Sequence, residues 1–434
     1  MNASCALIHA IPFVPGQAEG RLSFGPGEIE SDSIVVLRWW EIKQLARRPA
    51  AVIIVGYAPL AHPMIRLFGF GLPTVVVNEQ QAAGLVPGQR LMIDGDKGLI
   101  ASAGKLKVDP VASSVLKPDE VLHTADGQTV VLRTSVGSLE SAKRAKQFGA
   151  SGIGLLRSER FNPADGSQPD ADFYHRTFDE LCRTVAPMSV TIRLLDIVQD
   201  KRPPWLDEIS GMQGPLGLKG ARLYDTEPVR SVLHAELEAI NALAKQYPLS
   251  LLLPYIGQPE EFLHWREMIS RRLSLDIPIG TMIETPAVAL ALPEFLQMAD
   301  FVAIGCNDLM QCLFAADRDV VEVGHLLDPY SPFLFRFMQH LAESISEADM
   351  SRVQLCGLLS QFPGVMPIML GLGYRYFSVE PYLIPYLVQT IRNTTITDTQ
   401  KLADDVCRAH DAGTVRQRLD LAEWNMQEDY EGAG

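Results

Sequence analysis

The stretch that decides the fold reads Val190-Thr191-Ile192-Arg193-Leu194-Leu195-Asp196, an apolar run that ends in charged residues. Seven comparable runs accompany it, and helical stretches lie between them. These runs occupy residues 130–132, 153–156, 249–253, 279–283, 301–304, 353–356 and 375–379. Apolar runs of this kind are typical of parallel strands that are buried on both faces. Eight strand–helix units over about 250 residues predict a closed (β/α)8 barrel.

The residues before the barrel show a different sequence pattern, which predicts short strands and frequent turns. We expect strands at residues 33–37, 51–55, 73–77 and 88–96, and helices at 41–50 and 64–70. The expected fold is therefore an α/β chain in which a small β/α domain precedes a TIM barrel. The expected boundaries are residues 1–112 for the small domain, 113–128 for a linker, 129–395 for the barrel and 396–434 for a helical tail.

Composition excludes several classes of protein. The 434 residues carry 38 Lys and Arg against 52 Asp and Glu, a net charge of −14, and such an acidic chain is not expected to bind nucleic acid. No apolar run reaches about 18 residues, so no membrane span is expected. The six cysteines form no CxxC pair and no disulfide framework, and the start of the chain does not resemble a signal peptide. These features favour a cytoplasmic protein.

Reactive side chains follow five of the expected strands. Since the carboxyl ends of parallel barrel strands converge on one mouth, these side chains are expected to lie together. They are Arg157 and Glu159, Arg193 and Asp196, Glu284, Asn307 and Asp308, and Cys356.

The residue types at this mouth indicate its chemistry. Carboxylates with few histidines nearby favour Mg²⁺, which takes its remaining ligands from water and substrate oxygens. Arginines bind phosphate or carboxylate oxygens through two parallel hydrogen bonds. A thiol at the mouth can act as an acid, a base or a nucleophile. Together these groups suit a small phosphorylated acid and the transfer of its phosphoryl group.

Five motifs together resemble the phosphoenolpyruvate-utilising enzymes, and in particular the Enzyme I group of phosphoenolpyruvate-protein phosphotransferases. The resemblance covers nearly the whole chain. The motifs are GIGLLRSE at residues 152–159, IRLLDI at 192–197, TMIETP at 281–286, IGCNDLMQ at 304–311 and Cys356-Gly357.

The resemblance implies a role for each site residue. Glu284 and Asp308 would hold Mg²⁺, and Cys356 would exchange a proton with the methylene carbon of pyruvate enolate. His62 would carry the phosphoryl group on a phosphohistidine-type swivelling domain. The residues that would bind substrate are Arg157, Arg193, Lys219, Arg222, Asn307 and Arg318.

The chain departs from the family pattern near several of these residues. Leu60-Ala61 replaces the hydroxyl residues that usually precede the histidine, Lys219 stands where an arginine is expected, and Leu358 replaces the acid after Cys-Gly. Residues 24–33 pass directly between two strands where Enzyme I inserts a helical domain for docking the phosphocarrier HPr.

The favoured hypothesis is a Mg²⁺-dependent phosphotransferase that moves the phosphoryl group from phosphoenolpyruvate to His62 and releases pyruvate. Its acceptor would be a protein other than conventionally docked HPr. By resemblance, two copies would pair through the barrel as a homodimer. The departures keep two alternatives open: a non-catalytic regulatory protein that binds phosphoenolpyruvate or pyruvate, and a barrel enzyme that acts on another pyruvate-like acid.

Overall fold

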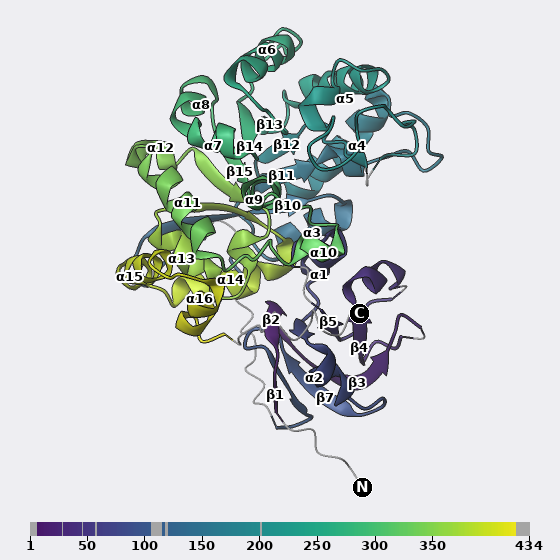
Figure 1. Cartoon of the computed structure of the whole chain (residues 1–434). Coiled ribbons are helices and arrows are strands. Elements are labelled where there is room, and N and C mark those ends of the chain that lie inside the picture. The colour runs from purple at the N-terminus through teal and green to yellow at the C-terminus, as the bar shows by residue number, and fades with distance from the viewer. Residues whose placement is uncertain are drawn as a thin grey trace.

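The computed structural model describes residues 7–27, 29–45, 47–56, 59–105, 115–117, 120–199 and 202–421. Two sheets organise these residues, a barrel and a smaller sheet that lies below it in Figure 1. The expected boundary at residues 112 and 113 and the last part of the expected tail, residues 422–434, fall outside the described ranges. The described part of the chain contains no helix that is long and apolar enough to cross a membrane.

The barrel confirms the predicted fold class. All eight expected runs form strands that pair in parallel in chain order, and β10 closes the ring because it pairs with both β17 and β11. The strands are β10 (Thr129–Val136), β11 (Ile153–Arg157), β12 (Val190–Arg193), β13 (Leu249–Leu253), β14 (Ile279–Ile283), β15 (Val302–Gly305), β16 (Val353–Cys356) and β17 (Tyr376–Val379). A two-residue strand, β9 (Leu122–His123), runs antiparallel to β10 inside the segment expected to be a linker.

Side chains fill the barrel interior, which is partly polar. Gln354 donates a hydrogen bond from Nε2 to the carbonyl of Gly154 at 3.1 Å, and Ser135 and Ser378 share a hydrogen bond of 3.0 Å. A Cβ at Gly154 would lie 2.6 Å from Gln354 Oε1 and 2.9 Å from Ser378 Cβ, so a larger residue would force these crossing side chains to shift.

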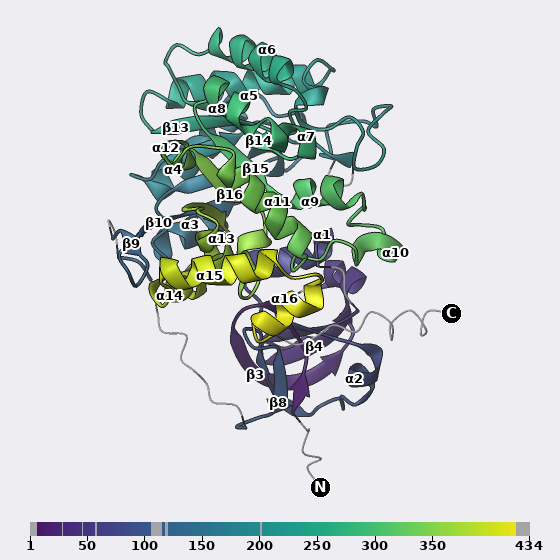
Figure 2. The ribbon, with the colours of Figure 1, turned by 60° about the vertical axis from the view of Figure 1, so that its left-hand side comes forward.

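Helices surround the barrel (Figure 2). The longer helices bury an apolar stripe against the barrel, as α4 does with Tyr174, Phe178 and Leu181. The α-helices are α3 (Leu139–Gln147), α4 (Ala171–Val185), α5 (Val229–Leu243), α6 (Pro259–Ser270), α7 (Pro286–Leu290), α8 (Leu292–Met298), α9 (Cys306–Phe314), α10 (Val321–Gly324), α11 (Pro332–Glu343), α12 (Glu347–Met350), α13 (Val365–Gly371), α14 (Ile384–Arg392), α15 (Ile396–Cys407) and α16 (Ala412–Arg418). Short 3₁₀ turns are η2 (Ser158–Arg160), η4 (Gly220–Leu223), η5 (Leu359–Gln361) and η6 (Pro381–Leu383).

The smaller sheet has eight strands in the order β1-β8-β7-β3-β4-β5-β6-β2. They are β1 (Ile8–His9), β2 (Ile11–Val14), β3 (Gln17–Phe24), β4 (Ser33–Arg38), β5 (Ala51–Val55), β6 (Thr74–Val77), β7 (Arg90–Asp94) and β8 (Leu99–Ser102), with helices α1 (His62–Phe70) and α2 (Glu79–Ala83). The helix expected at residues 41–50 is a 3₁₀ helix, η1 (Trp39–Gln44), because Leu45 is extended and Pro49 disfavours helix in the residue before it.

The direct passage between β3 and β4 is confirmed. Residues 25–32 join the two strands, which pair in parallel from Arg21 opposite Ser33 to Phe24 opposite Val36. No helix occurs in the described part of this connection, residues 25–27 and 29–32.

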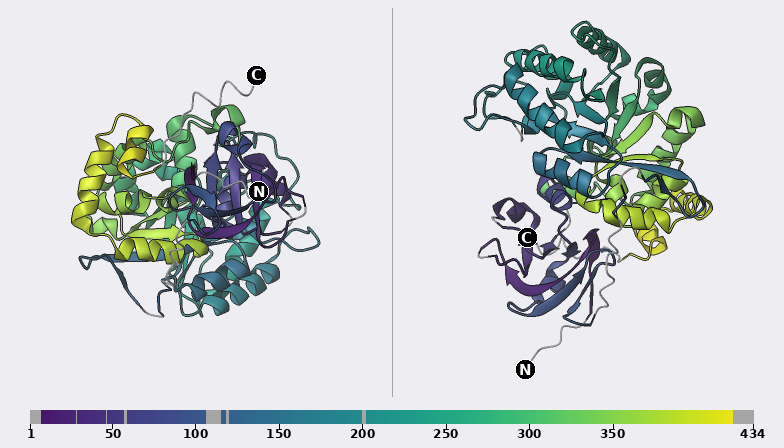
Figure 3. Two further views of the ribbon diagram at one scale, coloured as in Figure 1. Left: turned by 90° about the horizontal axis from the view of Figure 1, so that it is seen from below. Right: turned by 180° about the vertical axis from the view of Figure 1, so that it is seen from behind.

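An aromatic cluster joins the small sheet's unit to the barrel, and Figure 3 shows the two units stacked against each other. The Phe362 ring, which follows η5 of the barrel, lies 5.7 Å from the ring of Phe13 on β2 and 5.3 Å from that of Phe68 on α1. All three side chains are at most 2% exposed. Gly71, which follows α1, packs against Tyr382 of the barrel, since a Cβ at Gly71 would lie 2.5 Å from the Cβ of Tyr382. The two units therefore share one apolar core.

We expect Phe362→Ala to lower the free energy of unfolding by about 3–5 kcal/mol, because it leaves a cavity where three rings meet. Urea unfolding followed by circular dichroism measures the change. Phe333→Ala is the matched control, since this ring is 57% exposed and its loss should change stability by about 1 kcal/mol or less. Equal losses in the two variants would contradict a shared core at Phe362.

Candidate functional site

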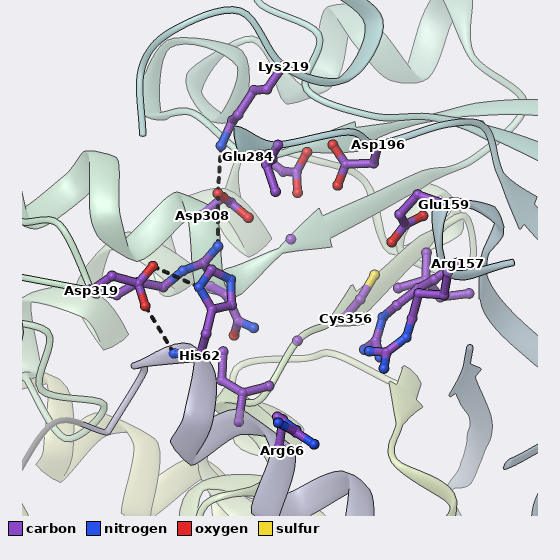
Figure 4. A pocket seen from close by; sticks show the side chains of 18 of the residues that line it. His62, Arg66, Arg157, Glu159, Asp196, Lys219, Glu284, Asp308, Asp319 and Cys356 are labelled. Carbon is purple, nitrogen blue, oxygen red and sulfur yellow. Dashed lines mark hydrogen bonds and ion pairs between the residues drawn. The ribbon is translucent and has the colours of Figure 1, made fainter. Parts of the chain in front are cut away.

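The barrel mouth and the small unit enclose one cavity of about 680 Å³ (Figure 4). The strand register explains why residues from different strand ends meet at this cavity. Arg157 lies opposite Arg193 on β11 and β12, and Gly305 lies opposite Cys356 on β15 and β16. The barrel contributes Arg157, Glu159, Arg160, Arg193, Asp196, Lys219, Tyr255, Glu284, Asn307, Asp308, Arg318, Asp319 and Cys356. The small unit contributes Trp39, Trp40, Lys43, His62, Pro63, Ile65 and Arg66.

Arg193 is the most strongly held cation of the mouth. Its Nη2 donates to Glu159 Oε1 at 2.6 Å, and its Nη1 lies 2.7 Å from Asp196 Oδ2. Burial alone would lower the pKa of Arg193, but the neighbouring carboxylates of Asp196 and Glu159 raise it above its ordinary value. Arg157 is paired as well, with Glu380 at 3.0 Å. Both guanidinium groups are thus fixed in place by carboxylate partners.

Two further carboxylates, those of Glu284 and Asp308, line the same cavity. Glu284 Oε2 accepts a hydrogen bond from the backbone of Tyr255 at 2.9 Å, and Lys219 donates to Asp308 Oδ1 at 2.7 Å. Burial, together with the nearby carboxylates of Asp308 and Asp196, raises the pKa of Glu284 from its ordinary value of 4.5 to about 8. Arg318 is a more distant neighbour, 3.7 Å from Asp308.

The donor set fits Mg²⁺ only if other ligands complete it. Among the described residues, no group of three or more His, Cys, Asp or Glu side chains is placed to hold a metal ion. Magnesium is, however, commonly bound by one or two carboxylates together with water and substrate oxygens. Glu284 and Asp308 both line the cavity and supply two carboxylates, of which that of Glu284 is buried. Mg²⁺ at this mouth stays a prediction.

Lys219 and Arg222 both contact Tyr255, but only one of them lines the cavity. The Lys219 ammonium lies 3.7 Å from the centroid of the Tyr255 ring, and the Arg222 guanidinium lies 4.7 Å from it. Lys219 is 6% exposed and faces Asp308, whereas Arg222 is exposed and does not line the cavity. The predicted role of Arg222 in substrate binding therefore has no support from its position, since its side chain does not line the cavity.

Cys356 ends β16 inside the cavity and is 2% exposed. Burial raises the pKa of its thiol to about 12, so the thiol keeps its proton near neutral pH. The adjacent loop also orients Asn307, whose Oδ1 accepts a hydrogen bond from the backbone of Leu358 at 3.0 Å. The Asn307 amide nitrogen is then the end that can donate to a ligand.

His62 is the first residue of α1, and it contacts the barrel. Its Nδ1 lies 2.7 Å from Oδ2 of Asp319, and its backbone N–H donates to Oδ1 of the same residue at 3.2 Å. Asp319 lies in the segment between α9 and α10, 257 positions from His62. Sequence reasoning missed this partner and missed Glu380, the partner of Arg157. The only local signal for Asp319 was its place next to Arg318.

Beneath the mouth, α5 places a carboxyl group in the core. Glu236 is 0% exposed, and its Oε2 accepts a hydrogen bond from the backbone of Leu195, two residues after Arg193, at 3.3 Å. Burial raises the pKa of Glu236 from its ordinary value of 4.5 to about 8. The group is therefore protonated near neutral pH in the folded protein.

We expect Glu236→Gln to flatten the dependence of stability on pH. Between pH 4.5 and 8 the folded protein keeps this proton and the unfolded chain releases it, so stability falls as pH rises. The substitution removes a slope on the order of 1 kcal/mol per pH unit, which urea unfolding at several pH values measures. Glu294→Gln, at an exposed carboxylate of α8, should keep the wild-type slope. Parallel slopes for all three proteins would contradict a buried, protonated Glu236.

Comparison with known proteins places the chain in a family. Residues 112–396 match the family described as PEP-utilising enzyme, PEP-binding domain. A multiphosphoryl transfer protein of Xanthomonas campestris is 30% identical over 82% of this chain and 44% of its own length. A phosphoenolpyruvate-protein phosphotransferase of Haloferax volcanii is 28% identical over 86% of this chain and 68% of its own.

A third relative is described as the phosphoenolpyruvate-dependent phosphotransferase system of Salmonella typhimurium, and it is 27% identical over 86% of this chain and 52% of its own length. The chain thus spans roughly half to two thirds of these relatives. Its barrel, which carries the charged mouth, lies within the matched residues. The chain belongs to the PEP-utilising enzyme family.

Proposed function

We propose that this chain is a Mg²⁺-dependent phosphotransferase that moves the phosphoryl group of phosphoenolpyruvate to His62 and then to an acceptor, with release of pyruvate. One observation carries the proposal: His62, which comes from the small unit, lines the same cavity as the arginines, carboxylates and thiol of the barrel mouth. A phosphoryl carrier must reach its donor, and this cavity brings carrier and binding groups together.

The cations of the mouth suit a small, highly charged anion. Arg157, Arg193 and Arg318 present guanidinium groups, which match the oxygens of phosphate and carboxylate, and Asn307 adds an amide donor. Lys219 contributes a compact charge in place of the arginine of the family pattern. These groups would hold phosphoenolpyruvate and neutralise charge as the phosphoryl group leaves.

Glu284 and Asp308 would hold Mg²⁺, with water and substrate oxygens as further ligands. The ion would neutralise negative charge on the substrate. It would also relieve the repulsion between carboxylates that the raised pKa of Glu284 reflects, after the larger effect of burial.

The chain's own residues account for both halves of the reaction. The Nε2 lone pair of neutral His62 attacks phosphorus, the bond from phosphorus to the enol oxygen breaks, and its electron pair stays on the enolate. Cys356 then gives its proton to the methylene carbon, which yields pyruvate and a thiolate that recovers a proton from solvent. A thiol whose pKa burial raises to about 12 holds the proton until the enolate forms.

The acceptor belongs to the same proposal. Residues 25–32 connect β3 and β4 directly, where the Enzyme I pattern places a helical docking domain. We therefore propose an acceptor protein that docks differently from HPr. A cytoplasmic location and a homodimer formed through the barrel complete the proposal.

The full-length protein should become labelled when it is incubated with phosphoenolpyruvate carrying ³²P and with Mg²⁺. The label should be stable to base and labile to acid, as a phosphohistidine is. His62→Gln should abolish the label, and EDTA should suppress it in the wild type. His340→Gln, at a histidine of α11 outside the cavity, is the matched control and should label normally.

A folded wild-type protein that takes up no label would exclude the phosphotransferase. Calorimetry on the same sample then separates the alternatives. Binding of phosphoenolpyruvate or pyruvate without turnover would indicate a regulatory protein, and turnover of another oxoacid would indicate a different barrel enzyme.

Cys356→Ala should slow pyruvate formation by about 10²–10⁴-fold, because the enolate loses its proton donor. Binding of phosphoenolpyruvate should change little, since the cations remain. Rapid-quench assays of pyruvate together with calorimetry measure the two effects. Cys312→Ala, at a cysteine that does not line the cavity, should behave like wild type. Equal rates for Cys356→Ala and wild type would remove Cys356 from the mechanism.

A further inference from the structure

We propose that Asp319 is the positioning residue for His62, so that the barrel itself supplies the group that prepares the histidine for phosphorylation. This inference rests on the proposed function, because it concerns the same histidine. It adds a residue that no motif indicates. It also makes the orientation and the tautomer of the His62 ring depend on contact between the two units.

The geometry is a two-point contact between one carboxylate and the start of α1. Asp319 Oδ2 lies 2.7 Å from His62 Nδ1, and Oδ1 accepts the His62 backbone N–H at 3.2 Å (Figure 4). The His62 side chain is only 14% exposed. The ring and the backbone of one residue are thus fixed by the same side chain, which leaves the imidazole little freedom to turn.

The contact also fixes which ring nitrogen is nucleophilic. Burial alone would raise the pKa of Asp319, but its hydrogen bonds with His62 lower it, so the carboxylate is ionised near neutral pH. An ionised carboxylate only accepts hydrogen bonds, so Nδ1 must carry the proton. In neutral imidazole the lone pair then lies on Nε2. Asp319 therefore selects Nε2 as the attacking atom.

The sequence around His62 shows why a distant part of the chain must orient the His62 ring and cap α1. Ala61 is the N-cap residue of α1 and makes no side-chain hydrogen bond to the helix start. Leu60 and Ala61 replace the hydroxyl residues of the family pattern, so no neighbouring hydroxyl in the stretch 59–61 can orient the ring. Asp319 both orients the ring and caps α1, because its carboxylate contacts His62 Nδ1 and accepts the His62 backbone N–H. Its negative charge is also stabilised by the positive end of the helix dipole.

The same carboxylate assists the transfer step. When Nε2 bonds to phosphorus and the bond from phosphorus to the enol oxygen breaks, the imidazole ring becomes cationic and keeps its proton on Nδ1. Asp319 stabilises that charge and remains ionised throughout. Because Asp319 belongs to the barrel, His62 receives this support only while the two units are in contact.

The first test needs no substrate. Long-range ¹H–¹⁵N spectra of protein labelled at histidine report the tautomer, and His62→Gln identifies the His62 signals. The wild type should show the neutral ring protonated at Nδ1. Asp319→Ala should lose that preference, and Asp319→Asn, which keeps an acceptor, should largely restore it. His62 signals that are unchanged in Asp319→Ala would overturn the inference.

The second test is the rate of labelling from phosphoenolpyruvate. Asp319→Ala should lower it at least about tenfold with the Kd for phosphoenolpyruvate unchanged, and ³¹P NMR should find the wild-type phosphoryl group on Nε2. Val320→Ala, at the exposed neighbouring residue, controls for disturbance of the loop and should label at the wild-type rate. Equal rates for Asp319→Ala and wild type, or a phosphoryl group on Nδ1, would overturn the inference.

The two tests distinguish failure of the phosphotransferase proposal from failure of the proposed role of Asp319. If the wild type takes up no label, the phosphotransferase proposal fails, and the spectra alone then decide whether Asp319 sets the tautomer of His62. If the wild type is labelled and Asp319→Ala is labelled equally fast, the phosphotransferase stands and only the role of Asp319 fails.

Discussion

Closure of the barrel between β10 and its two neighbours is the constraint on which the site depends. Once β10 pairs with both β11 and β17, all eight strands end around one rim and their last residues must face one another. Arg193 can be buried only because the rim brings Glu159 and Asp196 within 2.6 and 2.7 Å of its two terminal nitrogens. Without those partners a buried guanidinium would be strongly destabilising.

The rim alone leaves the cavity incomplete. Its carboxylates, cations and thiol can bind and polarise a phosphorylated acid, but within the described part of the barrel no histidine lines the cavity. The small unit adds His62, together with the aromatic pair Trp39 and Trp40, of which Trp39 is buried and Trp40 is 45% exposed. The cavity is therefore a property of two units in contact, and its chemistry is divided between them.

Sequence patterns predicted what depends on local order and strand periodicity. The eight strands were found because each is a short apolar run, and several mouth residues because they end or follow such a run. Lys219 and Arg318, which also line the cavity, were expected only from the family resemblance. Asp319 and Glu380 could not be found this way, since their partners lie 257 and 223 positions away and the pairing exists only in the folded chain. Arg222 shows the reverse, because it matches the family pattern but stacks on Tyr255 outside the cavity.

The aromatic cluster of Phe13, Phe68 and Phe362 has a thermodynamic consequence for any motion that carries His62 away from the barrel. Such a motion would expose these rings to water, so opening should have a positive change in heat capacity. The contact between His62 and Asp319 is polar and responds to salt, whereas the attraction between the rings weakens on cooling. Temperature and ionic strength therefore act on different halves of the same interface, one apolar and one charged.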